Sequence, residues 1–174
     1  MTAPIVRGAG LTASEEAVVG AQLGRPPRGT SAVGHRCPCG HPDVVVTEPR
    51  LPDGTPFPTT FYLTCPRAAS LIGSLEGSGL MAEMTERLGA DPTLAAAYAR
   101  AHERYLEARE AIGSVPEITG ISAGGMPSRV KCLHVLAAQA LAQGPGVNPL
   151  GDEVLGLLGE WWAQGPCVTG EEAP

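Results

Sequence analysis

The sequence predicts an α+β fold, in which a small three-stranded antiparallel sheet is followed by a bundle of about five helices. Three short runs rich in Val, Thr, Phe or Tyr lie before residue 66, and Gly or Pro clusters bound each of them. Almost all of the chain after residue 66 has the pattern of helices separated by Gly and Pro. Aromatic residues make up only 4% of the chain, so the core must consist mainly of Leu, Val and Ala. A length of 174 residues suits one domain, and we expect it to cover residues 1–165, with a flexible tail at 166–174.

Composition and charge exclude several classes of protein. The chain has 12 Lys and Arg against 18 Asp and Glu, a net charge of −6, so it lacks the basic surface that general nucleic-acid binding needs. No run reaches the roughly 20 apolar residues that span a bilayer, and residues 1–10 have no apolar core of a signal peptide. We therefore expect a cytoplasmic protein without a membrane segment. Five cysteines are an odd number for a disulfide framework, which favours metal binding or catalysis for any clustered thiols.

The first part of the chain predicts one helix and three strands. Thr12 and Glu15 fit a capping box that starts a helix ending at Leu23. The strands are predicted at Ser31–Cys37, Asp43–Thr47 and Thr59–Cys65. Because short loops connect them, they are expected to pair as an antiparallel meander.

The helical part divides at its Gly and Pro residues. Five helices are predicted, at Arg67–Glu76, Gly79–Leu88, Pro92–Ile112, Pro127–Gln143 and Pro149–Trp162. Asp91 and Asn148 are the expected N-caps of the third and the fifth, each followed by Pro at the first helical position. His102 lies among charged residues on what we interpret as a solvated face.

The cysteines suggest a site at one edge of the sheet. Strands one and three of a meander run in the same direction, so Cys37 and Cys65 at their ends should lie at the same edge, with Cys39 close by. Cys132, placed on the second turn of the fourth predicted helix, adds a third or fourth soft ligand. Such a set suits zinc, or alternatively an iron–sulfur cluster. His35 and His41 are further candidates for a fourth ligand. The alternative is that these cysteines simply pack as small apolar residues.

Helix geometry separates Cys132 from His134. Positions i and i+2 of a regular helix are about 200° apart, so both side chains are not expected to hold one ion. His134 falls on the predicted core face and Cys132 on a wetter face, which makes Cys132 the better ligand or nucleophile.

The glycine-rich segment before this helix suggests an anion site. Free N–H groups at a helix start carry partial positive charge, and glycines allow a ligand to approach closely. The expected anion-binding groups are Gly124, Gly125, Ser128, Arg129 and Lys131. Arg50, in the loop before the third strand, could also contribute. An ordinary helix start with surface cations is the alternative interpretation, and the spacing excludes a Walker A loop.

Four segments resemble a known family. They are RCP at 36–38, RLPDGTPFPT at 50–59, GGMPSRVKCLH at 124–134 and GPGVNP at 144–149. Together they resemble the actinobacterial family named domain of unknown function 501, over about residues 11–162. The resemblance implies that Cys37 and Cys132 match family positions, that Cys65 is replaced by His in some members, and that Cys39 is variable and the weakest ligand candidate. It implies no activity.

Three functions remain open from the sequence. The first is a zinc protein in which Cys37, Cys65 and Cys132 hold the ion, with Cys39, a His or water as the fourth ligand. An open fourth position would permit hydrolytic chemistry on a small phosphorylated or carboxylated molecule that Arg129 and Lys131 orient. The second is a metal-free binding module for a small anion, or a thiol enzyme that uses Cys132 beside Lys131. The third is a structural or regulatory interaction protein, in which Trp161 and Trp162 form a surface for a partner or for self-association.

Overall fold

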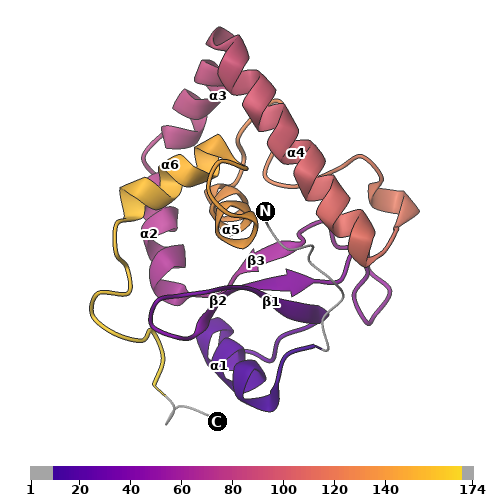
Figure 1. Ribbon diagram of the computed structural model, residues 1–174, viewed down its shortest axis with the longest axis vertical. Coiled ribbons are helices and arrows are strands. Elements are labelled where there is room, and N and C mark those ends of the chain that lie inside the picture. The colour runs from indigo at the N-terminus through magenta and orange to yellow at the C-terminus, as the bar shows by residue number, and fades with distance from the viewer. Residues whose placement is uncertain (1–9, 170–174) are drawn as a thin grey trace.

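Three strands and the helices around them make up the part of the chain described by the computed structural model, residues 10–169 (Figure 1). The elements are α1 (Ala13–Leu23), β1 (Thr30–Arg36), β2 (Pro42–Thr47), β3 (Phe61–Leu63), α2 (Pro66–Glu76), α3 (Leu80–Ala90), α4 (Pro92–Ile112), the short 3₁₀ helix η1 (Pro116–Ile118), α5 (Leu133–Gln143) and α6 (Pro149–Leu158). The predicted α+β class is confirmed. No helix within residues 10–169 is long and apolar enough to cross a membrane.

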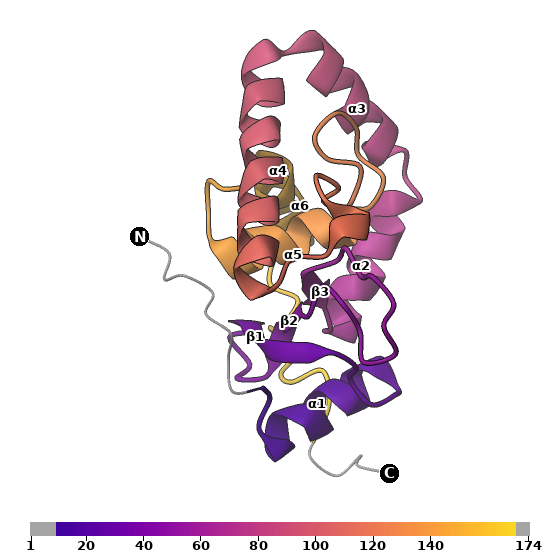
Figure 2. The same cartoon turned by 90° about the vertical axis from the view of Figure 1, so that its right-hand side faces the viewer.

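The sheet is the predicted antiparallel meander, with strand order β1-β2-β3. Every residue of β2 is buried, because β2 is the central strand and both faces of the sheet are covered. Figure 2 shows α1 on one side of the sheet and the remaining helices on the other. Val45 of β2 pairs with Val33 of β1 and with Tyr62 of β3, so these three side chains form a row on one face of the sheet.

The edge strand β3 is shorter than the predicted Thr59–Cys65. Besides its pairing with β2, its start is held by a tyrosine from α4, since the hydroxyl of Tyr105 accepts hydrogen bonds from the N–H groups of Thr60 (2.8 Å) and Phe61 (3.4 Å). The Tyr105 ring also packs edge-on against Phe61, with ring centroids 5.3 Å apart. This contact ties the long helix α4 to the sheet.

Replacing Tyr105 by Phe is therefore expected to lower the free energy of unfolding by about 1–3 kcal/mol, because it leaves buried backbone N–H groups without an acceptor. Urea denaturation of the two proteins measures this difference. Replacing the half-buried Tyr62 by Phe is the matched control and should have a much smaller effect. Equal losses for both variants would contradict the role given to the Tyr105 hydroxyl.

The segment before α5 differs most from prediction. The helix was predicted from Pro127 but begins at Leu133, and residues 124–131 form a closed loop instead. In this loop the Lys131 N–H donates to the Gly124 carbonyl (2.7 Å) and the Arg129 N–H donates to the Gly125 carbonyl (3.1 Å). Gly125 has a φ of +92°, and a Cβ there would lie 2.7 Å from the Arg129 carbonyl oxygen. The two glycines thus serve the closure of the loop.

The last predicted helix is also shorter than expected, since α6 ends at Leu158 and the two tryptophans follow it. Trp161 is buried and Trp162 half-buried, and their rings pack edge-on with centroids 4.6 Å apart. Side chains of other elements contact the end of the predicted domain and the start of the predicted tail. Arg67 donates to the Gly165 carbonyl (2.6 Å) and Gln22 Nε2 donates to Cys167 Sγ (3.3 Å). Residues 170–174 of that tail lie outside the described residues.

Candidate functional site

Three side chains with metal-ligand chemistry meet where the end of α2 faces the start of α5. Glu76 is the last residue of α2, Cys132 is the N-cap of α5 and His134 is the second residue of α5. A carboxylate oxygen, a thiol sulfur and a ring nitrogen from these three residues all lie within 4.8 Å of one another. We call this group the Glu76–Cys132–His134 cluster.

The Glu76 carboxylate connects the parts of the cluster. Its Oε1 accepts from the N–H of Leu133 (2.8 Å), which is a free donor of the first turn of α5, and lies 3.0 Å from Nδ1 of His134. An acidic side chain of the protein itself therefore lies at the positive end of α5.

The histidine lies between two acceptors. Nδ1 of His134 faces the Glu76 carboxylate, and Nε2 lies 3.2 Å from the carbonyl oxygen of Ala69. Neither a carboxylate nor a carbonyl can donate, so both hydrogen bonds form together only when both ring nitrogens carry protons. In the metal-free protein this environment favours the imidazolium form.

The pKa values in the cluster follow from these contacts. The hydrogen bond with Cys132, and then that with Glu76, outweigh burial and raise the pKa of His134 to about 9. Burial alone would raise the pKa of Glu76, but hydrogen bonds from His134 and the Leu133 N–H outweigh it and lower that pKa below its ordinary value. At neutral pH the cluster therefore contains a carboxylate and an imidazolium.

This raised pKa predicts how stability changes with pH. A group whose pKa is higher in the folded state stabilises that state fully below its ordinary pKa, here 6.5, and the stabilisation is lost as the pH rises to about 9. In chelator-treated protein, the free energy of unfolding should therefore fall between pH 6.5 and 9 relative to the His134→Gln variant. Urea denaturation across this range measures the difference, and a constant difference would contradict the assignment.

A groove of about 670 Å³ opens beside the cluster. Its lining comes from α1, β3, α2 and α5, and includes Gln22, Tyr62, Ser70, Cys132 and His134. The volume lies in the range of small-molecule sites, roughly 300–1,000 Å³. Two of the three side chains of the cluster thus face a space that a small ligand could enter.

The prediction that Cys132 and His134 face opposite sides is wrong. The angular rule applies inside a helix, whereas Cys132 precedes α5 with extended backbone angles, φ −153° and ψ 113°. Its side chain therefore turns toward His134 and Glu76. His134 was predicted on the core face, but its side chain is 33% exposed.

Within residues 10–169, the four cysteines of the predicted ligand set do not gather into one group that could hold an ion. Cys37 Sγ accepts from the N–H of Cys39 (3.5 Å), and Cys65 lies beside Cys167. Helix α2 separates Cys65, its N-cap, from Glu76 at its other end by eleven residues, about 16 Å along the axis at 1.5 Å per residue. Among residues 10–169, the group of three ligand atoms within reach of one ion includes Cys132 and none of the other three cysteines.

Two of the remaining thiols have the character of core residues. Cys37 is 5% exposed and Cys65 is 2% exposed. Burial raises the pKa of the Cys37 thiol to about 12 and that of the Cys65 thiol to about 11. Both groups are therefore neutral thiols at physiological pH, consistent with the packing alternative.

The predicted anion-binding residues do not converge on the groove. Ser128, Arg129 and Lys131 are exposed, and none of them lines the groove. Arg50 is engaged elsewhere, because it donates to both carboxylate oxygens of Glu117 (2.7 and 3.0 Å) and to the Gly54 carbonyl (2.8 Å). Gly124 and Gly125 close the loop described above.

The other polar residues considered from the sequence have structural partners. Asn148 caps α6 as predicted, accepting from the Gly151 N–H (2.9 Å), and also donates to Gln139 Oε1 (2.9 Å). His102 lies 2.7 Å from the hydroxyl of Ser122, and His35 lies 2.7 Å from the buried carboxylate of Asp43.

Sequence reasoning missed Glu76. It is 58 residues from His134 in the chain and ends an otherwise ordinary helix. No local pattern marks it, since its role depends on how α2 and α5 pack. The sequence did show two potential metal ligands close together, Cys132 and His134. Their side chains can be expected to face each other only when the helix is taken to begin at Leu133, so that Cys132 lies outside it.

Comparison with known proteins identifies a family that the chain matches. A family model described as "Protein of unknown function (DUF501)" matches residues 33–156, more than half of the chain. A search of curated proteins and a search of solved structures each found no match. The matched region includes all three residues of the Glu76–Cys132–His134 cluster. The chain therefore belongs to the DUF501 family, as the resemblance of its sequence segments predicted.

Proposed function

We propose that the Glu76–Cys132–His134 cluster is a zinc site with one open coordination position, and that it hydrolyses a small phosphorylated or carboxylated molecule. The observation that carries this proposal is the approach of three ligand atoms of different chemistry to within 4.8 Å of one another. Thiolate, imidazole and carboxylate are the ligands that zinc takes in proteins, and three protein ligands with a free fourth position are typical of catalytic zinc.

The surroundings support an open site rather than a closed structural one. Cys132 and His134 are half-buried and line the groove of about 670 Å³. A zinc ion supplies two things to hydrolysis: it polarises a carbonyl or phosphoryl oxygen, and it lowers the pKa of a bound water. Tyr62 and Ser70, which line the groove, carry hydroxyl groups suited to hydrogen bonds with a substrate.

A metal ion and protons compete for the same ligand atoms in this cluster. A ring nitrogen of His134 must lose its proton to bind zinc, and so must Cys132. Because the cluster raises the pKa of His134 to about 9, zinc affinity should increase as the pH rises from 7 to 9.

Titration with Co²⁺ tests the site, because the absorption spectrum of bound Co²⁺ depends on which ligands hold it. We expect one equivalent to bind with a thiolate-to-cobalt absorption band, and Zn²⁺ to displace it. The band should disappear in Cys132→Ala and persist in Cys39→Ser, which removes a predicted ligand that lies outside the cluster. Binding without a thiolate band, or equal loss in both variants, would overturn the proposal.

A metal-free thiol enzyme is the second candidate, supported by the same contacts. Cys132 hydrogen-bonds with His134, which in turn is held by the carboxylate of Glu76. A thiol beside an imidazolium, whose ring a carboxylate orients, is an arrangement that cysteine nucleophiles use. Chelator-treated protein distinguishes this function. If it applies, iodoacetamide should alkylate Cys132 at pH 7 faster than a free cysteine, and Glu76→Gln should slow the reaction. Alkylation at or below the rate of free cysteine would exclude it.

A further inference from the structure

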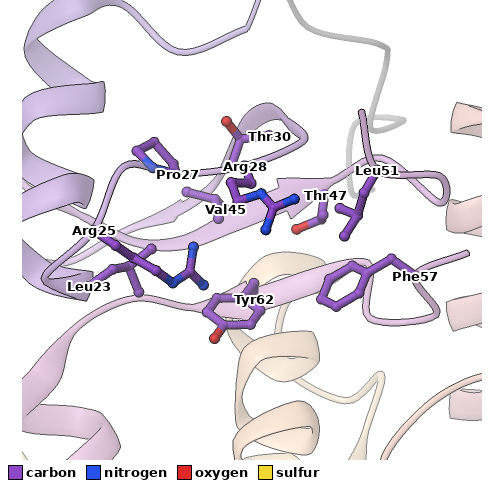
Figure 3. A pocket seen from close by; sticks show the side chains of 10 residues that line it. All are labelled: Leu23, Arg25, Pro27, Arg28, Thr30, Val45, Thr47, Leu51, Phe57 and Tyr62. Atoms are coloured by element: carbon purple, nitrogen blue, oxygen red, sulfur yellow. The ribbon is translucent and has the colours of Figure 1, made fainter. Parts of the chain in front are cut away.

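A second hollow, of about 290 Å³, lies on the face of the sheet beside α1 (Figure 3). Its floor is made by cross-strand pairs of the sheet, Thr30 with Thr47 and Val45 with Tyr62. Leu51 and Phe57, from the loop between β2 and β3, form one wall. The volume suits a small molecule at the lower end of the range for ligand pockets, roughly 300–1,000 Å³.

Two arginines from the connection between α1 and β1 border this hollow. Figure 3 shows the guanidinium groups of Arg25 and Arg28 turned toward the space above the Tyr62 ring. Arg28 forms an exposed ion pair with Asp53 (3.0 Å), and Arg25 makes a long hydrogen bond to the carbonyl of Pro26 (3.4 Å). Two guanidinium groups at one small hollow are notable in a chain with a net charge of −6.

The backbone that carries these arginines is constrained. Pro26 and Pro27 lie between them, and the ring of each proline fixes its φ near −65°. The Gly29 carbonyl accepts from the Glu48 N–H (2.7 Å), which joins this segment to the loop of Leu51 and Phe57. Gly29 itself lies so close to that loop that a Cβ would be 2.9 Å from Leu51 Cδ2. The positions of both arginine backbones are therefore set before any ligand binds.

The chemistry of the hollow has two parts. Guanidinium groups bind carboxylate and phosphate oxygens in pairs, through parallel N–H donors. Phe57 and Tyr62, with ring centroids 6.5 Å apart and planes 35° apart, give an aromatic surface next to them. A ligand that uses both parts has an anionic group at one end and a flat apolar body at the other.

We propose that this hollow binds a small aromatic acid, with its anionic group between Arg25 and Arg28 and its ring against Phe57 and Tyr62. This site is distinct from the Glu76–Cys132–His134 cluster, because neither Cys132 nor His134 lines the hollow. Leu23 and Tyr62 line both the hollow and the groove, so the two spaces are neighbours around the edge of β3. This proposal does not depend on the presence of zinc.

Titration with benzoate and phenyl phosphate, followed by backbone amide chemical shifts, tests the proposal and separates a carboxylate from a phosphate ligand. At least one of the two should bind saturably, with shifts in residues 24–30, 45–47 and 57–62. Benzyl alcohol lacks the charge and inorganic phosphate lacks the ring, so both should bind at least about tenfold more weakly. The absence of saturable binding by both acids would overturn the proposal.

Variants identify which groups bind. The double variant Arg25→Gln/Arg28→Gln should weaken binding of the acid at least about tenfold, whereas Arg100→Gln/Arg104→Gln, the same charge change on exposed residues of α4, should not. Phe57→Ala should weaken binding of the aromatic acid and leave that of inorganic phosphate unchanged. Cys132→Ser should bind as tightly as the unaltered protein. An equal loss in the α4 control, or no loss in Arg25→Gln/Arg28→Gln, would contradict the assignment.

Discussion

Replacing Gly151 by Ala is expected to lower the free energy of unfolding by about 3 kcal/mol, the upper part of the usual range for overpacking a core. Gly151 lies in the first turn of α6, where this helix crosses α5. A Cβ at this position would overlap the carbonyl oxygen of Leu136 and lie 2.9 Å from the Cβ of Ala140. Because a backbone atom of α5 blocks the space, a side-chain rotation cannot relieve the overlap and the two helices must separate.

Gly156, in the same helix, is the matched control for this substitution. It is exposed, and a Cβ there would have no atom within 4 Å. Gly156→Ala should therefore raise the free energy of unfolding by about 0.5–1 kcal/mol through helix propensity alone. Urea denaturation of both variants measures the contrast. Similar values for the two would show that α5 and α6 do not pack as closely as described.

Replacing Glu76 by Ala is expected to have the largest effect on the cluster. Without metal, the substitution leaves the Leu133 N–H and the Nδ1 of His134 without their acceptor, a cost of about 1–3 kcal/mol in the free energy of unfolding. With metal, it would also remove one of the three proposed ligands. Loss of an outer-shell partner already weakens metal binding about 10- to 100-fold, so the loss of Glu76 should exceed about 100-fold.

Two further variants separate these effects. Glu76→Gln retains an oxygen that can accept from the Leu133 N–H, so it should preserve most of the stability but still weaken metal binding. Glu86→Ala removes an exposed carboxylate from α3 and should change neither stability nor affinity. Denaturation with chelator and with excess Zn²⁺ measures both quantities. Unchanged zinc-dependent stabilisation in Glu76→Ala would exclude Glu76 as a ligand.

The sequence predicted the parts of the fold that depend on local signals. Asp91 followed by Pro92 marks the start of α4, and the side chain of Asp91 accepts from the N–H groups of Thr93 and Leu94 as an N-cap does. Thr12 and Glu15 form the predicted capping box of α1. Gly and Pro clusters likewise separated the three strands.

The start of α5 could not be predicted from local signals, because contacts with a distant helix determine it. Residues 127–132 contain acceptable helix formers, yet the N–H of Val130 donates to the hydroxyl of Thr85 on α3 (3.0 Å) and the loop closes on Gly124 and Gly125. An error of six residues in the start of this helix moved Cys132 from the N-cap to the second turn. That error reversed the predicted relation between Cys132 and His134.

Glu76 shows a second limit of sequence reasoning. Its carboxylate binds the first turn of a helix that starts 57 residues later, and only the packing of α2 on α5 brings them together. Thiols, in contrast, stand out in a sequence by their chemistry, and the prediction therefore grouped Cys37, Cys39 and Cys65 with Cys132. Burial in the core explains the positions of Cys37 and Cys65 without any ligand.

X-ray absorption spectroscopy at the zinc edge of the zinc-loaded protein tests the proposed ligand set directly. The Glu76–Cys132–His134 cluster predicts one sulfur at about 2.3 Å, with the remaining ligands nitrogen and oxygen at about 2.0–2.2 Å. A spectrum with several sulfur ligands would indicate the cysteine-rich set instead, and one without sulfur would exclude Cys132. Either result would contradict the proposed site.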